Sequence, residues 1–391
     1  MSRLFAAGTV LFLASLLYGK TAQGLTNSLR ETFLKVCRES LKQTGNIINM
    51  PRIFLRKLKS FYISARYFLS RMTNIPFVHP DFIQINLTNR CNLRCRICNV
   101  YKAPSSVNQE LTTAEIKQIV LQSVSLGPRR IVLSGGEPFL RSDLFEIVSF
   151  VKENTKMEIV ITTNGALIDS ELARKIIQAP INHLQISLDG AFKEAHDSVR
   201  GEGAFLKTTE AIKTLNKLGR SGLSLGLSFT VTQANYKEMR SFLDLARDLD
   251  VGNVLFIPLI EDNSYRHDKQ MASKALFTTR EAEEFDRILE QIGEFKKKYA
   301  RPTLSNFNNL SLYAKYFSGN LAGLRWRCYA GFHWIQVNPT GDMQMCGREF
   351  GNIRNRSLKD VWHSPQARNA RIEIKRCRRL CLQPCMSMPS E

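Results

Sequence analysis

The sequence is poor in acidic residues: its 391 residues include 35 Asp and Glu against 55 Lys and Arg, a formal net charge of +20. Such an excess of positive charge favours an anionic partner, either nucleic acid or an anionic membrane surface. An aromatic-rich RNA-recognition motif is also absent, so we do not expect nucleic acid as the partner. A non-catalytic RNA-binding protein built on zinc knuckles is the alternative from another function class.

The N-terminal apolar run is too short for a membrane span. Residues 4–18 would form a helix of ~22 Å, whereas the hydrocarbon core of a bilayer is roughly 30 Å thick. In isolation, the run is typical of the hydrophobic region of a signal peptide. Because no acidic residue precedes Glu31, an organelle-targeting segment is a second interpretation.

The cysteines do not suit a disulfide framework. There are nine, an odd number, and most fall in two groups, which favours metal ligation in a reduced, oxygen-poor interior. The first group, Cys91, Cys95 and Cys98, has the spacing C-x3-C-x2-C directly after a predicted strand at residues 82–87. No nearby cysteine pair completes a closed zinc site, and thiolates are the ligands of iron–sulfur clusters. Three ligands would leave one iron of a four-iron cluster open to a small molecule.

From residue 80 onward, apolar strands alternate with amphipathic helices. We expect strands at residues 82–87, 130–134, 158–163, 183–187, 223–231 and 253–257, and helices at residues 112–126, 142–154, 169–178, 205–218 and 236–249. Repeated βα units predict an α/β fold with a parallel sheet, in which ligands bind outside the carboxyl ends of the strands.

A glycine-rich turn follows the second predicted strand. It comprises Gly135, Gly136, Glu137 and Pro138. Two glycines let the backbone approach a ligand closely, and Pro138 stiffens the exit from the turn. Glu137 would repel a phosphate, so we do not expect a phosphate site here.

The cysteine loop and this turn together resemble the signature of radical S-adenosylmethionine (SAM) enzymes. The resemblance implies a [4Fe–4S] cluster whose open iron binds SAM. One electron from an external donor such as flavodoxin or ferredoxin splits SAM, and the resulting 5′-deoxyadenosyl radical abstracts a hydrogen atom from the substrate. It also implies a partial (β/α)6 TIM-like barrel. Ile97 departs from the family, which usually has an aromatic residue there, and we expect its aliphatic side chain to cover the cluster and adenine instead.

The resemblance assigns further SAM contacts to the ends of the later strands. Glu137 would bind the amino group of SAM, and the ribose and carboxylate would be contacted by polar residues including Asn164, Ser187 and Asp189. Arg200, in the stretch 196–201, would reach the SAM carboxylate, and the alternative is a solvated salt bridge. We expect Thr230 and the strand end at residues 257–258 to line the ligand.

The second cysteine group lies near the C-terminus. It comprises Cys328, Cys346, Cys377, Cys381 and Cys385, with a predicted hairpin of strands at residues 334–337 and 343–346. The pattern Cys328-x12-Gly341-x4-Cys346 resembles the SPASM/twitch auxiliary-cluster domains of radical SAM enzymes, which have seven cysteines when they bind two clusters. Five cysteines favour one auxiliary [4Fe–4S] cluster, ligated by Cys328, Cys346 and two of the other three. A zinc knuckle is the alternative.

The N-terminal segment combines positive charge with an apolar helical stripe. Residues 1–75 contain twelve Lys/Arg and two Asp/Glu, a net charge of +10. One face of a predicted helix carries Phe54, Leu58, Phe61, Ala65, Phe68 and Met72. Such a helix suits the surface of an anionic membrane, whereas packing of the stripe against the catalytic domain is the alternative. Because export would separate the cluster from cellular SAM and reductants, we expect an interfacial anchor at the cytoplasmic face of a membrane.

These observations predict four parts and one general activity. We expect a helical extension at residues 1–75, a radical SAM core at 76–275, a helical linker at 276–325 and an α+β auxiliary-cluster domain at 326–391. The expected enzyme abstracts hydrogen from a lipid-linked substrate, a sugar or another small molecule, leading to dehydrogenation, epimerisation or bond formation. A peptide-modifying maturase is the alternative, disfavoured because no winged-helix domain that binds a leader peptide precedes the barrel.

Overall fold

The computed structural model describes residues 52–102, 109–220, 222–259, 277–305, 310–319 and 328–377. The described residues from Arg71 onward belong to one compact unit, and those before it belong to another. The predicted apolar run at residues 4–18, together with Cys37, Cys381 and Cys385, lies outside the described residues.

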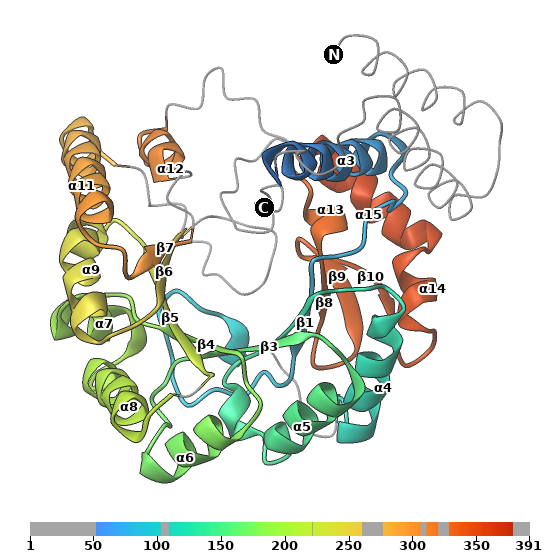
Figure 1. The fold of residues 1–391 in the computed structure, drawn as a ribbon, viewed down its shortest axis with the longest axis horizontal. Coiled ribbons are helices and arrows are strands. Elements are labelled where there is room, and N and C mark those ends of the chain that lie inside the picture. Colours follow the sequence, from blue (N-terminus) through green and yellow to red (C-terminus); the bar gives the residue numbers. More distant parts are fainter. Residues whose placement is uncertain are drawn as a thin grey trace. The chain divides into compact units, whose positions relative to one another are not determined.

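A ten-stranded sheet organises the larger unit, with the strand order β10-β9-β8-β1-β2-β3-β4-β5-β6-β7 (Figure 1). The first six strands are parallel, as predicted. They are β1 (Phe82–Asn86), β2 (Arg130–Ser134), β3 (Glu158–Thr163), β4 (His183–Ser187), β5 (Ser224–Val231) and β6 (Asn253–Pro258), and a short β7 (Thr303–Leu304) follows β6. The fold is a mixed α/β architecture consistent with a partial TIM barrel.

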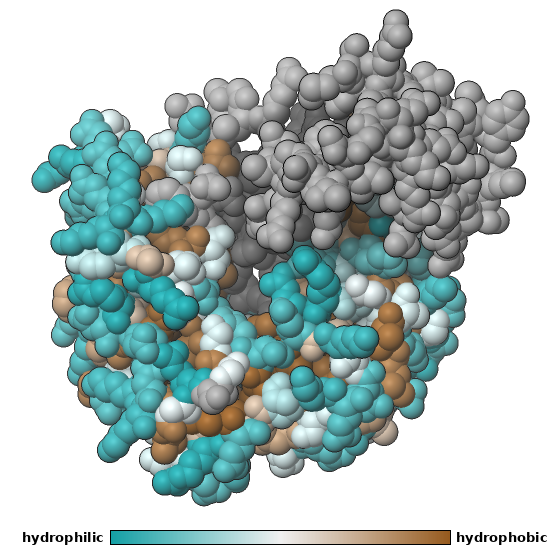
Figure 2. All heavy atoms as spheres, in the orientation of Figure 1, coloured by the Kyte–Doolittle hydropathy of each residue, from teal (hydrophilic) through white to brown (hydrophobic). Residues whose placement is uncertain are grey.

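Helices cover the outer face of these strands (Figure 1). They are α4 (Thr113–Val124), α5 (Leu144–Asn154), α6 (Ser170–Gln178), α7 (Lys193–Arg200), α8 (Ala204–Leu218), α9 (Met239–Asp248), α11 (Thr279–Lys298) and α12 (Leu310–Phe317). Alternate strand residues such as Ile83, Ile85 and Leu133 are fully buried against them in the core. Figure 2 shows mostly hydrophilic side chains around α11 and α9, as expected for the solvent-facing sides of amphipathic helices.

The opposite face of the sheet carries many polar side chains. On β1, Gln84 alternates with the buried Ile83 and Ile85. Thr162 of β3 and Gln185 of β4, which pair with each other, are partly exposed on the same face. When polar and apolar residues alternate along a strand, the apolar residues predict the face that packs against the helices. The inner face therefore provides the polar surface on which a ligand can bind.

The C-terminal part continues the same sheet rather than forming a separate one. Its elements are α13 (Ala330–His333), β8 (Trp334–Val337), β9 (Asp342–Met345), β10 (Arg348–Asn352), α14 (Leu358–Trp362) and α15 (Pro365–Arg376). Strand β8 pairs in parallel with β1, and β9 and β10 follow antiparallel. The hairpin was predicted, but its pairing with β1 was not, because strand partners distant in sequence leave no local pattern.

Three other local predictions differ from the structure. The residues around Arg200 form helix α7, which the sequence analysis read only as a motif, and the predicted helix at 236–249 begins as a 3₁₀ turn, Tyr236–Glu238. The second hairpin strand ends at Met345, one residue before Cys346. Short helices and strand ends depend on tertiary contacts that propensity does not record.

Helix α3 (Arg52–Thr73) confirms the predicted N-terminal helix. Across the described ranges, none of the helices is both long enough and apolar enough to span a bilayer.

Candidate active site

The cysteine loop follows β1 at the carboxyl edge of the sheet, and the glycine-rich turn after β2 packs directly on its backbone. Gly136 N donates to Thr88 O (2.7 Å) and Glu137 N donates to Arg90 O (2.8 Å). A Cβ atom at Gly136 would lie 2.1 Å from Arg90 O, and one at Gly135 would lie 2.4 Å from Thr88 O. The glycines were expected to let the backbone approach a ligand. In the structure their nearest neighbours belong to the cysteine loop, and the approach of the same backbone to a ligand stays a prediction.

The loop brings Cys91, Cys95 and Cys98 together. Cys95 is buried and the other two are partly exposed. Backbone amides point at two of the sulfurs, from Leu93 N to Cys91 Sγ and from Val100 N to Cys98 Sγ, both at 3.5 Å. Burial raises the pKa of Cys95 to about 11, the cation of Arg200 opposes this, and the nearby thiols of Cys98 and Cys91 raise it further.

An apolar cluster covers one side of this loop. Ile97 and Cys95 are buried together with Val199 and Leu259. The loop is also tied to α7, because Arg96 N donates to Val199 O (2.8 Å). Ile97 thus packs beside Cys95, and its covering of the cluster and adenine stays a prediction.

Glu137 is fully buried beneath the loop and is already well hydrogen-bonded. Its Oε1 accepts from Thr163 Oγ1 (2.8 Å) and Phe139 N (3.3 Å), and its Oε2 accepts from Asn164 N (2.9 Å). Burial raises the pKa of Glu137 to about 7, although these donors and the charge of Arg200 oppose the shift. A carboxylate has about four acceptor positions, so roughly one is left for a ligand. Pro138 begins the 3₁₀ turn that leads away from the site.

Asn164 contacts the first cysteine directly. Its Nδ2 lies 3.7 Å from Cys91 Sγ and donates to Asn92 Oδ1 at 2.8 Å. Amide N–H groups directed at a sulfur ligand are among the features that tune an iron–sulfur cluster. Asn92 is a site residue that the sequence analysis missed, since an asparagine between two cysteines carries no distinctive signal.

Arg200 and Asp189 form a buried ion pair next to the cysteines. Arg200 Nε donates to Asp189 Oδ2 (2.6 Å), and the other oxygen of Asp189 accepts from Thr230 N (2.7 Å). Burial would lower the pKa of Arg200, but the charges of Asp189 and Cys95 raise it overall. Asp189 is fully buried and both of its oxygens are engaged, so it orients Arg200, whereas its contact with SAM stays a prediction. The solvated salt bridge considered as the alternative for Arg200 is not what the structure has.

Further residues support this ion pair. His196 Nδ1 accepts from Asp189 N (3.0 Å), and Asn235 Nδ2 donates to Asp189 O (2.9 Å). Burial lowers the pKa of His196 to about 4, so its ring is neutral at pH 7 and carries its proton on Nε2. Ser187 lies at the end of β4 on the inner face, partly exposed. Asn235 was not predicted, because it lies in an ordinary turn sequence.

The second cysteine group is assembled from three separate segments. Cys328 precedes α13, Cys346 follows β9 and Cys377 caps α15. Burial raises the pKa of Cys328 to about 11, and the thiols of Cys346 and Cys377 raise it further. Cys346 has a positive φ of 50°, an uncommon conformation for a residue other than glycine.

The scaffold of this group contains a buried cation. Arg371 is 2% exposed, and it donates to Gly331 O and Trp362 O, both at 2.9 Å. Its guanidinium carbon lies 4.4 Å from the Trp362 ring centroid. Arg371 thereby joins α15 to α13 and to the end of α14.

The two cysteine groups lie at opposite edges of the sheet. The first follows the carboxyl end of β1. Because β9 runs antiparallel to β8 and β8 parallel to β1, Cys346 lies at the amino edge. The five residues of β1 at ~3.3 Å each separate the two edges by about 17 Å.

A ladder of carboxamides connects the strands between these edges. Asn338 Oδ1 accepts from Gln344 (2.9 Å), Gln336 (3.4 Å) and Asn86 (3.4 Å), and Asn86 Oδ1 accepts from Gln84 (2.9 Å). Buried polar groups that satisfy one another fix the relative position of their backbones. The ladder therefore holds the hairpin in register with β1.

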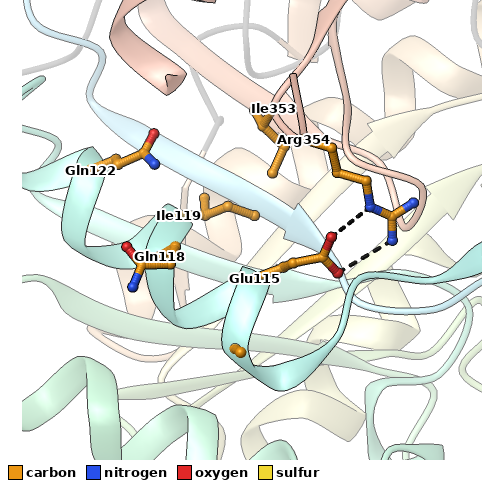
Figure 3. A pocket seen from close by; sticks show the side chains of 7 residues that line it. Glu115, Gln118, Ile119, Gln122, Ile353 and Arg354 are labelled. Atoms are coloured by element: carbon orange, nitrogen blue, oxygen red, sulfur yellow. Dashed lines mark hydrogen bonds and ion pairs between the residues drawn. The ribbon is translucent and has the colours of Figure 1, made fainter. Parts of the chain in front are cut away.

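A second contact joins the two parts on the outside of the sheet. Arg354 forms two hydrogen bonds with the Glu115 carboxylate of α4, 2.6 Å and 3.3 Å long (Figure 3). The groove around this pair is lined by Ala114, Gln118, Ile119, Gln122 and Ile353. None of the predicted site residues lies in this groove.

The chemistry of the cysteine groups suits iron–sulfur clusters. Among the described residues, no three His, Cys, Asp or Glu side chains converge closely enough to hold one metal ion. Loops that supply only thiols, with amide N–H groups directed at the sulfurs, fit iron–sulfur clusters.

Two family models match the chain. Residues 85–262 match the radical SAM superfamily, and residues 328–386 match the SPASM iron–sulfur cluster-binding domain. The chain is 28% identical to an Fe-coproporphyrin III synthase of Methanosarcina barkeri over 71% of its own length and 72% of that protein. It is 32% identical to a probable GTP 3′,8-cyclase of Methanocaldococcus jannaschii over 46% of the chain and 60% of that protein.

The fold is similar to that of a solved structure. The crystal structure of Streptococcus suis SuiB bound to S-adenosylmethionine has a TM-score of 0.62 and 15% identity, covering 89% of this chain and 80% of that one. This likeness concerns the fold alone.

Proposed function

We propose that the chain abstracts a hydrogen atom from a membrane-associated substrate bound on the inner face of its sheet. The chain belongs to the radical SAM superfamily and carries an SPASM domain. It is therefore an enzyme with a SAM-binding [4Fe–4S] cluster and an auxiliary iron–sulfur cluster. When bound, the first cluster and SAM supply the electron transfer and radical that this reaction requires. The enzyme class excludes the RNA-binding alternative.

We assign the first cluster to Cys91, Cys95 and Cys98. The observation that carries this assignment is the packing of the Gly135–Gly136 turn on the cysteine loop, which fixes the loop above Glu137. We expect Glu137 and the strand ends at Asn164, Ser187 and Thr230 to contact SAM beside these thiols. Arg200, held by Asp189, supplies a fixed positive charge for a carboxylate or for the anionic cluster. The apolar cover around Ile97 excludes water from the buried side of the site.

We assign the auxiliary cluster to Cys328, Cys346 and Cys377, completed by Cys381 or Cys385. Cys346 lies at the amino edge of the sheet, and Cys328 precedes α13, which leads into β8 at the same edge. A substrate on the inner face would lie between the two clusters, so that the auxiliary cluster could bind it or accept an electron after hydrogen abstraction.

The inner face offers hydrogen-bond donors to a substrate. Gln185 Nε2 and Trp334 Nε1 are buried there without an acceptor in the described part of the chain. A buried N–H without a partner costs about 1–3 kcal/mol, which a substrate oxygen can recover. This favours a substrate that carries hydroxyl, carbonyl or carboxylate oxygens near the strands β4 and β8.

Membrane association is supported by the exposed apolar residues of α3. Phe68 is 49% and Met72 56% exposed, on the face that carries the predicted stripe. Arg66 and Arg71 lie on the same helix, so apolar and basic residues occur together, as in helices that bind anionic lipid surfaces. We therefore propose that the enzyme works at the cytoplasmic face of a membrane on a lipid-linked or membrane-partitioned substrate.

A porphyrin is the second candidate substrate. An Fe-coproporphyrin III synthase and an AdoMet-dependent heme synthase, both of Methanosarcina barkeri, are 28% identical to the chain over 71% and 75% of its length. A porphyrin with carboxylate side chains would also satisfy the donors on the inner face.

Anaerobic reconstitution tests the catalytic proposal. The reconstituted protein should form 5′-deoxyadenosine from SAM after reduction with dithionite, and Cys98→Ala should abolish this. Formation of the same amount by the variant, or none by the wild-type chain, would contradict the assignment.

Vesicle binding and an optical titration separate the substrates. Phe68→Asp with Met72→Asp should weaken binding to vesicles that contain phosphatidylserine by at least about tenfold, since each apolar side chain contributes roughly 1.5–3 kcal/mol when buried. Leu206→Asp, at an equally exposed position on α8, is the matched control. Fe-coproporphyrin III should shift its absorption spectrum on binding only if the porphyrin candidate is correct.

A further inference from the structure

The loop that carries the first cysteine group is basic on its outer side. From residue 88 to residue 109 the chain has four cations and no acidic residue. The cations are Arg90, Arg94, Arg96 and Lys102, and all four are exposed. We call these four residues the basic rim.

Aromatic contacts gather part of the rim into one patch. The guanidinium carbon of Arg94 lies 5.0 Å and Lys102 Nζ lies 5.7 Å from the centroid of the Tyr101 ring. Arg94 lies between the first two cysteines and Lys102 follows the third, so Tyr101 brings them together. Arg94 Nη1 also donates to Cys91 O (2.8 Å), which fixes this cation beside a cysteine.

Arg96 adds a cation between the second and third cysteines. Its backbone N–H is bound to Val199 O, so the origin of the side chain is fixed next to Cys95. Neither Arg94 nor Arg96 pairs with a carboxylate of the described residues, whereas most other arginines near the sheet do. Their charges therefore act on whatever approaches the loop from solvent.

We propose that the basic rim is the docking surface for an acidic, low-potential one-electron carrier protein of the flavodoxin type. The inference rests on the proposed function, in which the cluster held by these cysteines gains one electron that the carrier loses. Cys91 and Cys98 are partly exposed and lie in the same loop as the rim, so a carrier bound to the rim would lie beside the thiols that would hold the cluster. Complementary charges at such a place raise association rates by about 10–10³-fold and make them depend on salt.

Two reductants test the rim on the full reconstituted chain. The rate of 5′-deoxyadenosine formation is measured with a reduced acidic flavodoxin and with dithionite, and the ratio of the two rates is compared among variants. We expect Arg96→Glu to lower this ratio by about tenfold or more, and rising salt to lower the wild-type ratio.

Lys297→Glu is the matched control, because it makes the same change of charge at an exposed position at the end of α11, far along the chain from the loop. Its ratio should equal that of the wild type. An equal fall in both variants would show an effect of net charge alone, and an unchanged ratio in Arg96→Glu would show that the carrier docks elsewhere; either result overturns the proposal. Absence of 5′-deoxyadenosine with dithionite in the wild-type chain would instead refute the proposed function.

Discussion

The two cysteine groups share one sheet but are built in different ways. The first is a single loop in which three cysteines fall within eight residues, supported from below by Glu137 and Asn164. The second collects Cys328, Cys346 and Cys377 from segments up to 49 positions apart, on a scaffold fixed by the buried Arg371. A local site depends on the backbone packed against it, whereas a distributed site depends on the tertiary structure that gathers its parts.

The largest expected effect comes from Gly136→Ala. The new Cβ would lie 2.1 Å from Arg90 O. Because its nearest neighbours are backbone atoms of Arg90 and Asn89, the loop must shift, at a cost of about 1–3 kcal/mol or more. We expect loss of the first cluster, about half of the iron, and of SAM cleavage, while the auxiliary cluster stays. Iron analysis and electron paramagnetic resonance measure this. Cys328→Ser should give the reciprocal loss, and equal loss of both clusters in Gly136→Ala would break the comparison.

A smaller effect is expected for Arg371→Met, and it should be confined to the second cysteine group. The substitution leaves the carbonyls of Gly331 and Trp362 buried without their donor, at roughly 1–3 kcal/mol each. The auxiliary cluster should become labile while SAM still binds to the reconstituted protein. Arg368→Met, an exposed arginine on the same helix, is the control. A change of SAM affinity equal to the loss of auxiliary iron would show that the two sites are not independent.

The smallest effect is expected at the contact in Figure 3. The hydrogen bond from Arg354 lowers the pKa of Glu115 to about 2. A carboxyl group whose pKa is lowered by folding stabilises the fold above its unfolded value of 4.5, and this contribution is lost as the pH falls toward 2. Since the pair is about one third exposed, Arg354→Gln should cost only ~0.5–1 kcal/mol near pH 7 and less near pH 4. Urea unfolding at both pH values checks this, and an equal cost at both would contradict it.

The sequence predicted the local site better than the distributed one. Six parallel strands, the cysteine loop and the glycine-rich turn follow from short patterns, and strands β3 and β4 have the predicted bounds. The pairing of β8 with β1, the ladder around Asn338 and the buried Arg371 were not predicted, because each depends on residues more than 200 positions apart or on burial that composition does not reveal. The bonds of Asp189 to Arg200 and to Thr230 N show the same limit within the site, because they join segments that are separate in the sequence.

The parallel pairing of β8 with β1 also covers the backbone of the first barrel strand. Without β8, the first strand of the barrel would present unpaired N–H and C=O groups along an apolar strand, which is a template for intermolecular pairing. The C-terminal part thus covers an aggregation-prone strand edge in addition to carrying the second cysteine group. A chain that ends before Cys328 should therefore aggregate even if its first cluster can still form.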